Sequence, residues 1–288
     1  MRAVLVVINY NTRDDLRTCL LSAQDKLSGF PVLVVDNGST DGSREMVERD
    51  FPWVKLVKNR GNLGYASACN LGLRMTEEPY VFILNSDVEF PAGGLEVLLD
   101  FMDDHPEVAA LGPLVLNPDG SRQMSCRRFP TLWESVVHGF LGEIWPDNPL
   151  TRRYQLKDLP PDRPREVDWV SGAAMLLRRE AVERVGGFDE AYFMYVEDVD
   201  LCWRLRQAGY RVYFHPGFRA IHKIGSSSSQ RSLRMLWEHH RSMLIFFRRR
   251  YQGWRKAIAV VPVYLGVLVR FTFVVISRIS QKMRGKAG

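Results

Sequence analysis

The stretch Y-V-F-I-L-N-S-D-V-E-F-P at residues 80–91 decides the fold. It opens with a continuous apolar and aromatic run, which predicts a fully buried strand at the centre of a sheet. Asn85, Ser86 and Asp87 follow this run directly, and ligands of open α/β sheets bind just beyond the carboxyl ends of the strands. Asp87 therefore either holds a divalent metal against phosphate oxygens or only caps a turn before Pro91.

Predicted strands and helices alternate from the N-terminus up to this stretch. Apolar runs predict strands at residues 3–8, 31–35 and 54–57. Helical spacing predicts helices at residues 12–23, 43–48 and 65–75, the first with a capping box of Thr12 and Asp15. This alternation predicts an α/β fold with a doubly wound, mostly parallel sheet. Because parallel strand tips share one edge, we expect a binding crevice there that collects Tyr10, Asn11, Asp36, Asn62 and Asp87.

The second half of the chain has a weaker pattern. A helix at residues 94–105 and a strand at 108–116 precede an irregular region at 121–165, which we expect to supply mobile acceptor-side loops. A helix that ends at Gly209 is predicted to begin near Asp198. Residues 169–177 are predicted to form either a pair of strands or one strand bent around Ser171-Gly172, and further strands are predicted at 210–214 and 220–222.

Length, charge and cysteine content limit the function. A chain of 288 residues holds one large α/β domain or two small ones, and its four cysteines form no C-x-x-C pair. This use of cysteine argues against a zinc ribbon and indicates a reducing compartment. Residues 231–288 carry a net charge of +12, whereas residues 1–230 carry −6, within an overall +6. A domain of that negative charge argues against nucleic acid as a partner.

Several further motifs occur in order along the chain: V-V-I-N-Y-N at 6–11, V-V-D-N-G-S-T-D-G at 34–42, N-R-G-N-L-G-Y-A-S-A-C-N-L-G at 59–72, L-N-S-D at 84–87, G-A-A-M-L-L-R-R at 172–179, G-G-F-D-E at 186–190 and Y-V-E-D-V-D-L-C-W-R at 195–204. With them the chain resembles family 2 glycosyltransferases of the GT-A fold, in the rhamnosyltransferase-like branch. The resemblance implies a catalytic domain at residues 1–230. Its nucleotide-sugar half would cover about 1–116 and its acceptor half about 117–230, with a basic and apolar helical segment at 231–288.

The resemblance also implies where the sugar nucleotide binds. Asp36 would accept a hydrogen bond from the pyrimidine ring, which suits a carboxylate facing an imide N–H. Asp36 can at the same time cap the turn that follows it. The other residues placed at the sugar nucleotide by the resemblance are Asn9, Tyr10, Asn11, Arg60, Asn62, Asn85, Ser86, Asp87 and Gly172.

The metal motif of the resembled family is D-x-D, and this chain has Asn85-Ser86-Asp87 in its place. Asp87 is then the main protein ligand of a divalent cation, Mg²⁺ or Mn²⁺, and the diphosphate supplies further oxygens. His222 occupies a position where some relatives place an additional metal ligand. It is either that ligand or a structural histidine.

Glu197-Asp198 matches the acidic pair of the family, in which the aspartate is the general base. A carboxylate can take the proton of a sugar hydroxyl as the oxygen attacks C1, and one such displacement inverts the anomeric centre. The alternative is that Asp198 only caps its helix. Asp189 either binds the acceptor or orders its loop.

The segment at 231–288 needs its own explanation. Residues 257–269 are almost entirely apolar but too short for a span, which takes about 20 residues, and basic clusters flank both sides. We expect an interfacial segment on the anionic cytoplasmic leaflet of a bacterial or archaeal inner membrane. The alternatives are a spanning or re-entrant helix and a contact between copies in a homo-oligomer.

The leading hypothesis for function is an inverting glycosyltransferase of cell-envelope polysaccharide synthesis. It would move rhamnose from dTDP-rhamnose to a glycan or a polyprenyl-linked acceptor. One alternative is a UDP-hexose donor. Another is a non-catalytic sugar-nucleotide binding module, which Asn85 supports and the Glu197-Asp198 pair opposes. Nucleotidyl transfer is disfavoured because the loop at residues 9–15 is acidic and lacks glycine.

Overall fold

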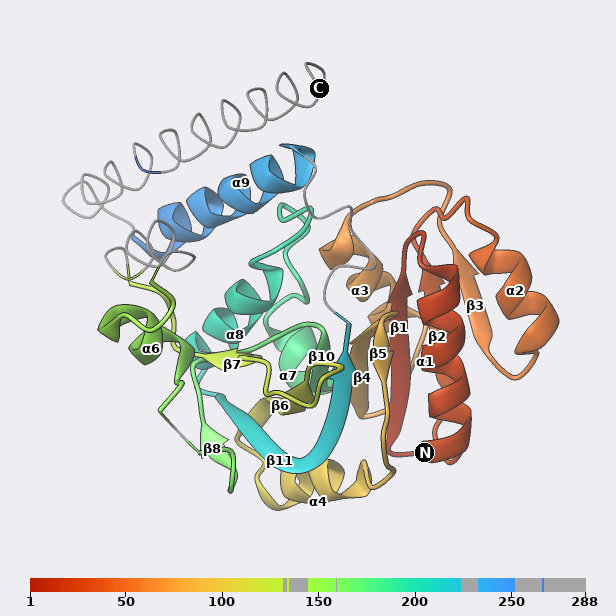
Figure 1. The fold of residues 1–288 in the computed structure, drawn as a ribbon, viewed down its shortest axis with the longest axis horizontal. Coiled ribbons are helices and arrows are strands. Elements are labelled where there is room, and N and C mark those ends of the chain that lie inside the picture. The colour runs from red at the N-terminus through yellow and green to blue at the C-terminus, as the bar shows by residue number, and fades with distance from the viewer. Residues whose placement is uncertain (132–133, 135–144, 159, 224–232, 252–265, 267–288) are drawn as a thin grey trace, which may run out of the picture.

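The structure, a computed structural model, describes residues 1–131, 134, 145–158, 160–223, 233–251 and 266. Figure 1 shows helices on both sides of a central mixed sheet. The strands are β1 (Ala3–Asn9), β2 (Val32–Asp36), β3 (Lys55–Lys58), β4 (Tyr80–Asn85), β5 (Val88–Glu89), β6 (Val108–Leu116), β7 (Cys126–Arg127), β8 (Arg165–Glu166), β9 (Trp169–Val170), β10 (Ala174–Arg178) and β11 (Arg211–His222). The helices are α1 (Arg13–Lys26), α2 (Ser43–Asp50), α3 (Tyr65–Arg74), α4 (Glu96–Asp104), α6 (Pro149–Gln155), α7 (Arg179–Arg184), α8 (Glu197–Gln207) and α9 (Leu233–Arg250).

The first four long strands form the parallel part of the sheet, in the order β3-β2-β1-β4. Alternate side chains of β1 enter two different cores, as the two-residue period of a strand requires. Val4, Val6 and Ile8 pack with α3 and α8, whereas Leu5 and Val7 pack with α1, α2 and α4. The predicted α/β fold with a doubly wound sheet is thereby confirmed.

The remainder of the sheet is mixed. Strand β10 runs antiparallel to both β4 and β6, and β11 is parallel to β6. The two short strands predicted at 210–214 and 220–222 form one bent strand, β11, because its register with β6 shifts between His215 and Arg219. Pro216 and Gly217 lie in that interval, where proline cannot donate a ladder hydrogen bond. The bend carries the end of β11 across to β5.

Helix α1 follows Thr12 as predicted, but the predicted capping box and the N-cap role of Asp198 are corrected by the structure. Within the described residues the Thr12 side chain does not cap α1; instead, its hydroxyl donates to Asn9 Oδ1 at 2.8 Å. Helix α8 begins at Glu197 with Val196 as its N-cap, so Asp198 is the second residue of the helix. Asp198 therefore does not serve as the N-cap.

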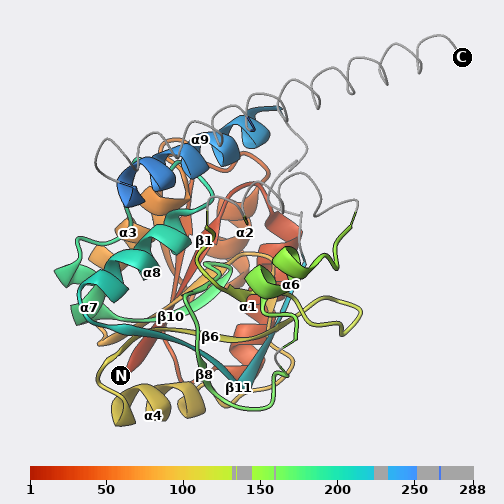
Figure 2. The same ribbon diagram turned by 90° about the vertical axis from the view of Figure 1, so that its left-hand side faces the viewer.

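Helix α9 lies over α8 at the top of both views (Figures 1 and 2). Phe246 and Phe247 of α9 are completely buried in the same core as α8, and Phe246 meets Trp203 edge to face. No helix within the described ranges has the length and apolar character needed to cross a bilayer. The apolar run at 257–269 lies outside the described residues, apart from Gly266.

Candidate active site

A cavity of about 280 Å³ lies at the carboxyl end of β4. It brings together residues from distant parts of the chain, which come from β4, β7, the turn before β10, the start of α8, the end of β11 and α9. The predicted residues that line it are Asn85, Asp87, Gly172, Glu197, Asp198 and His222. The two aspartates proposed for metal binding and for proton transfer therefore border one cavity.

Asp87 and His222 are neighbours because β5 and β11 pair. Val88 lies opposite His222 in that antiparallel pair, and the Lys223 N–H donates to the Asp87 carbonyl at 3.1 Å. The His222 Nε2 atom then lies 3.2 Å from Asp87 Oδ1. Asp87 is only 2% exposed, and its Oδ1 accepts no hydrogen bond from the described residues.

The hydrogen bonds of His222 determine which ring nitrogen carries the proton. The Gln123 amide donates to the His222 carbonyl at 2.7 Å, so its oxygen faces His222 Nδ1 at 3.0 Å. An amide oxygen can only accept, which assigns a proton to Nδ1, and the neutral tautomer of this arrangement keeps a lone pair on Nε2. The Asn85 amide lies 3.3 Å from that Nε2.

This arrangement fits a divalent cation. A lone pair of His222 and an oxygen of Asp87 converge on one point, and the outer ring nitrogen is oriented by Gln123, as is usual for a metal-ligating histidine. In the part of the chain that the structure describes, no group of three or more His, Cys, Asp or Glu side chains is arranged to hold a metal. Such a cation would need oxygens from a bound substrate to complete its coordination.

The acidic pair sits on a strained turn. Tyr195 and Val196 both have positive φ, 68° and 71°, directly before Glu197. A left-handed conformation is unusual for a β-branched residue such as Val196, and strain of this kind is concentrated at functional sites. Here it turns the first residues of α8 toward the cavity.

Helix α9 contacts the segment that leads into this turn. Ser242 Oγ donates to the Met194 carbonyl at 3.0 Å, and the His239 ring meets Tyr195 edge to face. The guanidinium of Arg234 lies 5.0 Å from the Phe193 ring centre. His239 and Met243 also line the cavity itself.

Asp198 is held by backbone groups. Its Oδ2 accepts from the Gly172 N–H at 2.9 Å, and its Oδ1 accepts from the Val199 N–H at 2.8 Å. The Gly172 carbonyl in turn accepts from the Tyr65 hydroxyl at 2.7 Å. These bonds fix the direction in which the carboxylate presents its remaining lone pairs.

Burial raises the pKa of both acids of the pair. For Asp198, the backbone N–H groups of Gly172 and Val199 and the charge of Arg127 oppose this rise without cancelling it. For Glu197, the charge of Asp198 adds to the effect of burial and raises the pKa further. A carboxylate with a raised pKa is a stronger base than one in water.

The nucleotide end of the predicted crevice is a closed hydrogen-bond network. Asp36 is 1% exposed, and its Oδ1 accepts from the backbone N–H groups of Gly38 and Ser39 and from Arg44. Its Oδ2 accepts from the Asn9 amide at 2.8 Å, which leaves one acceptor position for a ring N–H. Burial alone would raise the pKa of Asp36, but the bonds from Ser39, Arg44 and Asn9 lower it below its ordinary value.

The other predicted nucleotide residues lie around this network and off the cavity lining. The Asn11 side chain accepts from the Thr40 N–H, and the Asn62 oxygen accepts from the Asn37 amide. Tyr10 and Arg60 are exposed. Ser86 is buried and shares a hydrogen bond of 2.6 Å with the Thr12 hydroxyl, so it links β4 to the start of α1.

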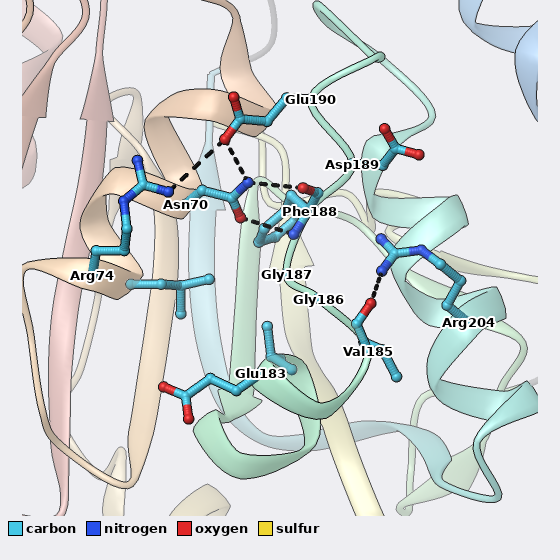
Figure 3. A pocket seen from close by; sticks show the side chains of 12 residues that line it. Asn70, Arg74, Glu183, Val185, Gly186, Gly187, Phe188, Asp189, Glu190 and Arg204 are labelled. Atoms are coloured by element: carbon cyan, nitrogen blue, oxygen red, sulfur yellow. Dashed lines mark hydrogen bonds and ion pairs between the residues drawn. The ribbon is translucent and has the colours of Figure 1, made fainter.

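A second and larger cavity, of about 650 Å³, lies between α3, α7 and the G-G-F-D-E loop (Figure 3). The Asn70 amide there bonds both the N–H and the carbonyl of Phe188, and Arg204 donates to the Val185 carbonyl. Asp189 forms an ion pair with Arg249 of α9. These contacts brace the loop and leave the acidic pair at the smaller cavity, so we assign the chemistry to the smaller one.

Four residues of the site are not singled out by the sequence, although one of them, Tyr65, falls within the motif at residues 59–72. Gln123 and Arg127 come from the region predicted to be irregular, and only β7 and its pairing with β9 place Arg127 at the cavity. Tyr65 and His239 lie on helices, where an aromatic side chain usually indicates packing.

The family model described as "Glycosyl transferase family 2" matches residues 4–186. The chain belongs to glycosyltransferase family 2. A second model, described as "N-terminal domain of galactosyltransferase", matches residues 159–227 of this family 2 enzyme.

Two relatives of this glycosyltransferase are rhamnosyltransferases. The chain is 39% identical over 237 residues to the N-acetylglucosaminyl-diphospho-decaprenol L-rhamnosyltransferase of Mycobacterium tuberculosis H37Rv, covering 78% of this chain and 77% of the relative. It is 34% identical over 230 residues to rhamnosyltransferase WbbL of Escherichia coli K12, covering 76% and 82%. The enzyme is thus a rhamnosyltransferase-like member of its family.

The solved structure of a mannosyltransferase from Pyrobaculum calidifontis, in complex with GDP-Man and Mn²⁺, has a similar fold. The TM-score is 0.59 at 18% sequence identity, and the match covers 97% of this chain and 75% of the other. This similarity supports the GT-A fold of the family 2 glycosyltransferase.

Proposed function

We propose that this glycosyltransferase transfers rhamnose from dTDP-rhamnose, with inversion, to a sugar carried on a polyprenyl diphosphate in cell-envelope glycan synthesis. The observation that carries the proposal is the shared cavity of Asp87, His222 and Asp198. The name of the relative with 39% identity supports both the donor sugar and the lipid-linked acceptor.

The proposed reaction is one displacement at C1 of the donor sugar. Asp198 accepts the proton of the acceptor hydroxyl as its oxygen forms a bond to C1 on the face opposite the diphosphate. The bond between C1 and the diphosphate oxygen breaks at the same time, which inverts the anomeric centre. Burial and the charge of Asp198 raise the pKa of Glu197, which favours its neutral form and so limits the negative charge beside Asp198.

Asp87 and His222 would hold a divalent cation, Mg²⁺ or Mn²⁺, with Gln123 orienting the histidine. When bound, the cation neutralises negative charge on the diphosphate leaving group. Asp36 would accept a hydrogen bond from the thymine N–H and thereby orient the nucleotide.

The experiment that tests the proposal is a donor panel with a synthetic N-acetylglucosaminyl-diphospho-prenol acceptor and Mg²⁺ or Mn²⁺. We expect transfer from dTDP-rhamnose above transfer from UDP-hexoses, and a product whose NMR coupling constants show inversion. Preferred transfer from a UDP-hexose would show that dTDP-rhamnose is not the donor. Retention of configuration at C1 would reject the single displacement.

We also propose that the enzyme acts at the cytoplasmic membrane surface as a peripheral protein. Trp237 of α9 is 51% exposed, and residues 231–288 carry +12. Binding to vesicles that contain anionic lipid should weaken on deletion of residues 254–288. Equal sedimentation of full-length and truncated protein would reject the membrane role of that segment.

A further inference from the structure

Arg127 is held in the catalytic cavity as a preoriented cation. Its guanidinium carbon lies 5.5 Å from the Tyr154 ring centre and 5.4 Å from the Trp169 ring centre. Its Nε donates to the Met124 carbonyl at 2.8 Å. The aromatic contacts and this bond fix the side chain before any substrate arrives.

The opposite edge of the guanidinium is left for a ligand. No carboxylate of the described residues forms an ion pair with Arg127, and its two Nη atoms have no hydrogen-bond acceptor among those residues. Asp168, on the neighbouring strand connection, pairs with Arg206 instead. Two parallel N–H groups in a fixed fork match two oxygens of a phosphate.

We propose that Arg127 binds a phosphate of the acceptor, the diphosphate that joins the acceptor sugar to its lipid. This inference rests on the proposed function, because it assumes an acceptor that carries phosphate. The cation site of Asp87 and His222 already provides for the donor diphosphate. Arg127 belongs instead to β7, which pairs with β9 in the acceptor half.

The surroundings of Arg127 agree with such an acceptor. Arg127 is close enough to Asp198 for their charges to interact. A sugar 1-diphosphate that presents a hydroxyl to Asp198 carries its phosphate about one ring width away. The same cavity is also lined by Pro130, Met194 and Met243, which offer apolar surface to the first part of a lipid chain.

The test compares two acceptors that differ only in phosphate: N-acetylglucosaminyl-diphospho-prenol and an alkyl glycoside of the same sugar. For Arg127→Gln we expect KM for the diphosphate acceptor to rise about 10-fold or more, as for a lost charge-assisted pair. KM for the glycoside and for the donor should stay unchanged. Arg127→Lys keeps the charge but lacks the forked pair of N–H groups. Its KM for the diphosphate acceptor should lie between those of wild type and Arg127→Gln.

The matched control is Arg128→Gln, which removes the same charge from the adjacent, exposed position and should leave every KM unchanged. A rise in donor KM would assign Arg127 to the donor phosphate and overturn the inference. An equal rise for both acceptors would overturn it as well. If Arg127→Gln does not fold, Arg127→Lys serves as the test. Its KM for the diphosphate acceptor should then rise relative to its KM for the alkyl glycoside.

Failure of the proposed function has a different signature. Wild-type enzyme would then transfer to neither acceptor, and the inference would fall with the proposal. If wild type uses both acceptors with equal KM, the proposed transfer stands and only the role of Arg127 is overturned.

Discussion

Asp36 is the last residue of β2 and Asp198 is the second residue of α8, and the protein holds these two carboxylates differently. Asp36 accepts bonds from Gly38, Ser39, Arg44 and Asn9, and its pKa is lowered. Asp198 accepts from two backbone N–H groups only, and burial raises its pKa. The first carboxylate is stabilised as a fixed anion, which suits binding, and the second is poised to take up a proton.

The same difference extends to the residues around them. At the nucleotide end, the buried amide of Asn9 donates to Asp36, that of Asn59 donates to Asn37, and that of Asn37 donates to the Gly64 carbonyl. At the catalytic end, Asp87 Oδ1 and Glu197 Oε2 are buried without a hydrogen bond from the described residues. Unsatisfied buried groups are costly, so a site keeps them where a ligand or a proton will complete them.

The largest effect is expected for Asp198→Asn. The amide keeps the shape but cannot accept the proton, so kcat should fall about 10²- to 10⁴-fold. Affinity for the nucleotide, measured by calorimetry with dTDP, should stay within about 2-fold of wild type because the nucleotide end is intact. Asp162→Asn is the matched surface control. Full activity of Asp198→Asn would assign the base to another residue.

A smaller effect is expected from Asp87, whose Oδ1 accepts no hydrogen bond from the described residues. Asp87→Asn should weaken Mn²⁺ binding in the presence of dTDP at least about 10-fold, because it removes the carboxylate whose Oδ1 lies 3.2 Å from His222 Nε2. Gln123→Leu should weaken it by up to about 10-fold through loss of the histidine orientation. Calorimetric titration of Mn²⁺ measures both, with the exposed Gln207→Leu as control. Unchanged Mn²⁺ affinity in Asp87→Asn would show that Asp87 is not a ligand of the cation.

At the nucleotide end, a substitution should change the free energy of unfolding rather than kcat. The Asn37 amide donates to Asn62 and to the Gly64 carbonyl and accepts from Asn59 and Leu63. Asn37→Ala leaves these buried partners unpaired and should lower the free energy of unfolding by about 3 kcal/mol, or Tm by about 5–10 °C. The kcat of the folded enzyme should change little.

Thermal denaturation and initial rates measure the two effects separately. Asn117→Ala, which removes only the exposed bond from Asn117 to Ser121, is the control and should stay within about 0.5 kcal/mol of wild type. A large loss of kcat in Asn37→Ala at unchanged Tm would contradict the division between the two ends.

Much of the donor side could be predicted from the sequence because its signals are local. Each parallel strand is a continuous apolar run that ends in polar residues, so Asp36 and Asp87 could be placed at strand ends before the structure was known. The acidic pair could be placed by its motif. The distance of the acidic pair from Asp87 could not be predicted, because this distance depends on how β9, β10 and α8 pack together.

The acceptor side depends on contacts that no local pattern encodes. His222 reaches Asp87 only through the pairing of β11 with the two-residue strand β5. Arg127 and Gln123 lie on a region with few regular elements, where polar residues are expected on sequence grounds to be solvated. The packing of α9 through Phe246 and Phe247 likewise depends on tertiary contacts rather than helical period.

The last effect, which separates the unsatisfied acids from catalysis, is the pH dependence of stability in Glu197→Gln. The pKa of Glu197 is raised in the folded state above its unfolded value of about 4.3. Below that pH both states are protonated, and the variant should match wild type. As pH rises from there through the folded pKa, wild type loses stability because the folded state resists ionisation. The variant has no proton to lose, so by pH 8 it should be the more stable protein, by about 1.4 kcal/mol for each unit by which the pKa is raised.

Urea unfolding at pH 4 and pH 8 measures the difference, with the exposed Glu77→Gln expected to show none. A variant less stable than wild type at pH 8 would mean that Glu197 is ionised and paired in the folded protein, and the contrast with Asp36 would then hold for Asp198 alone.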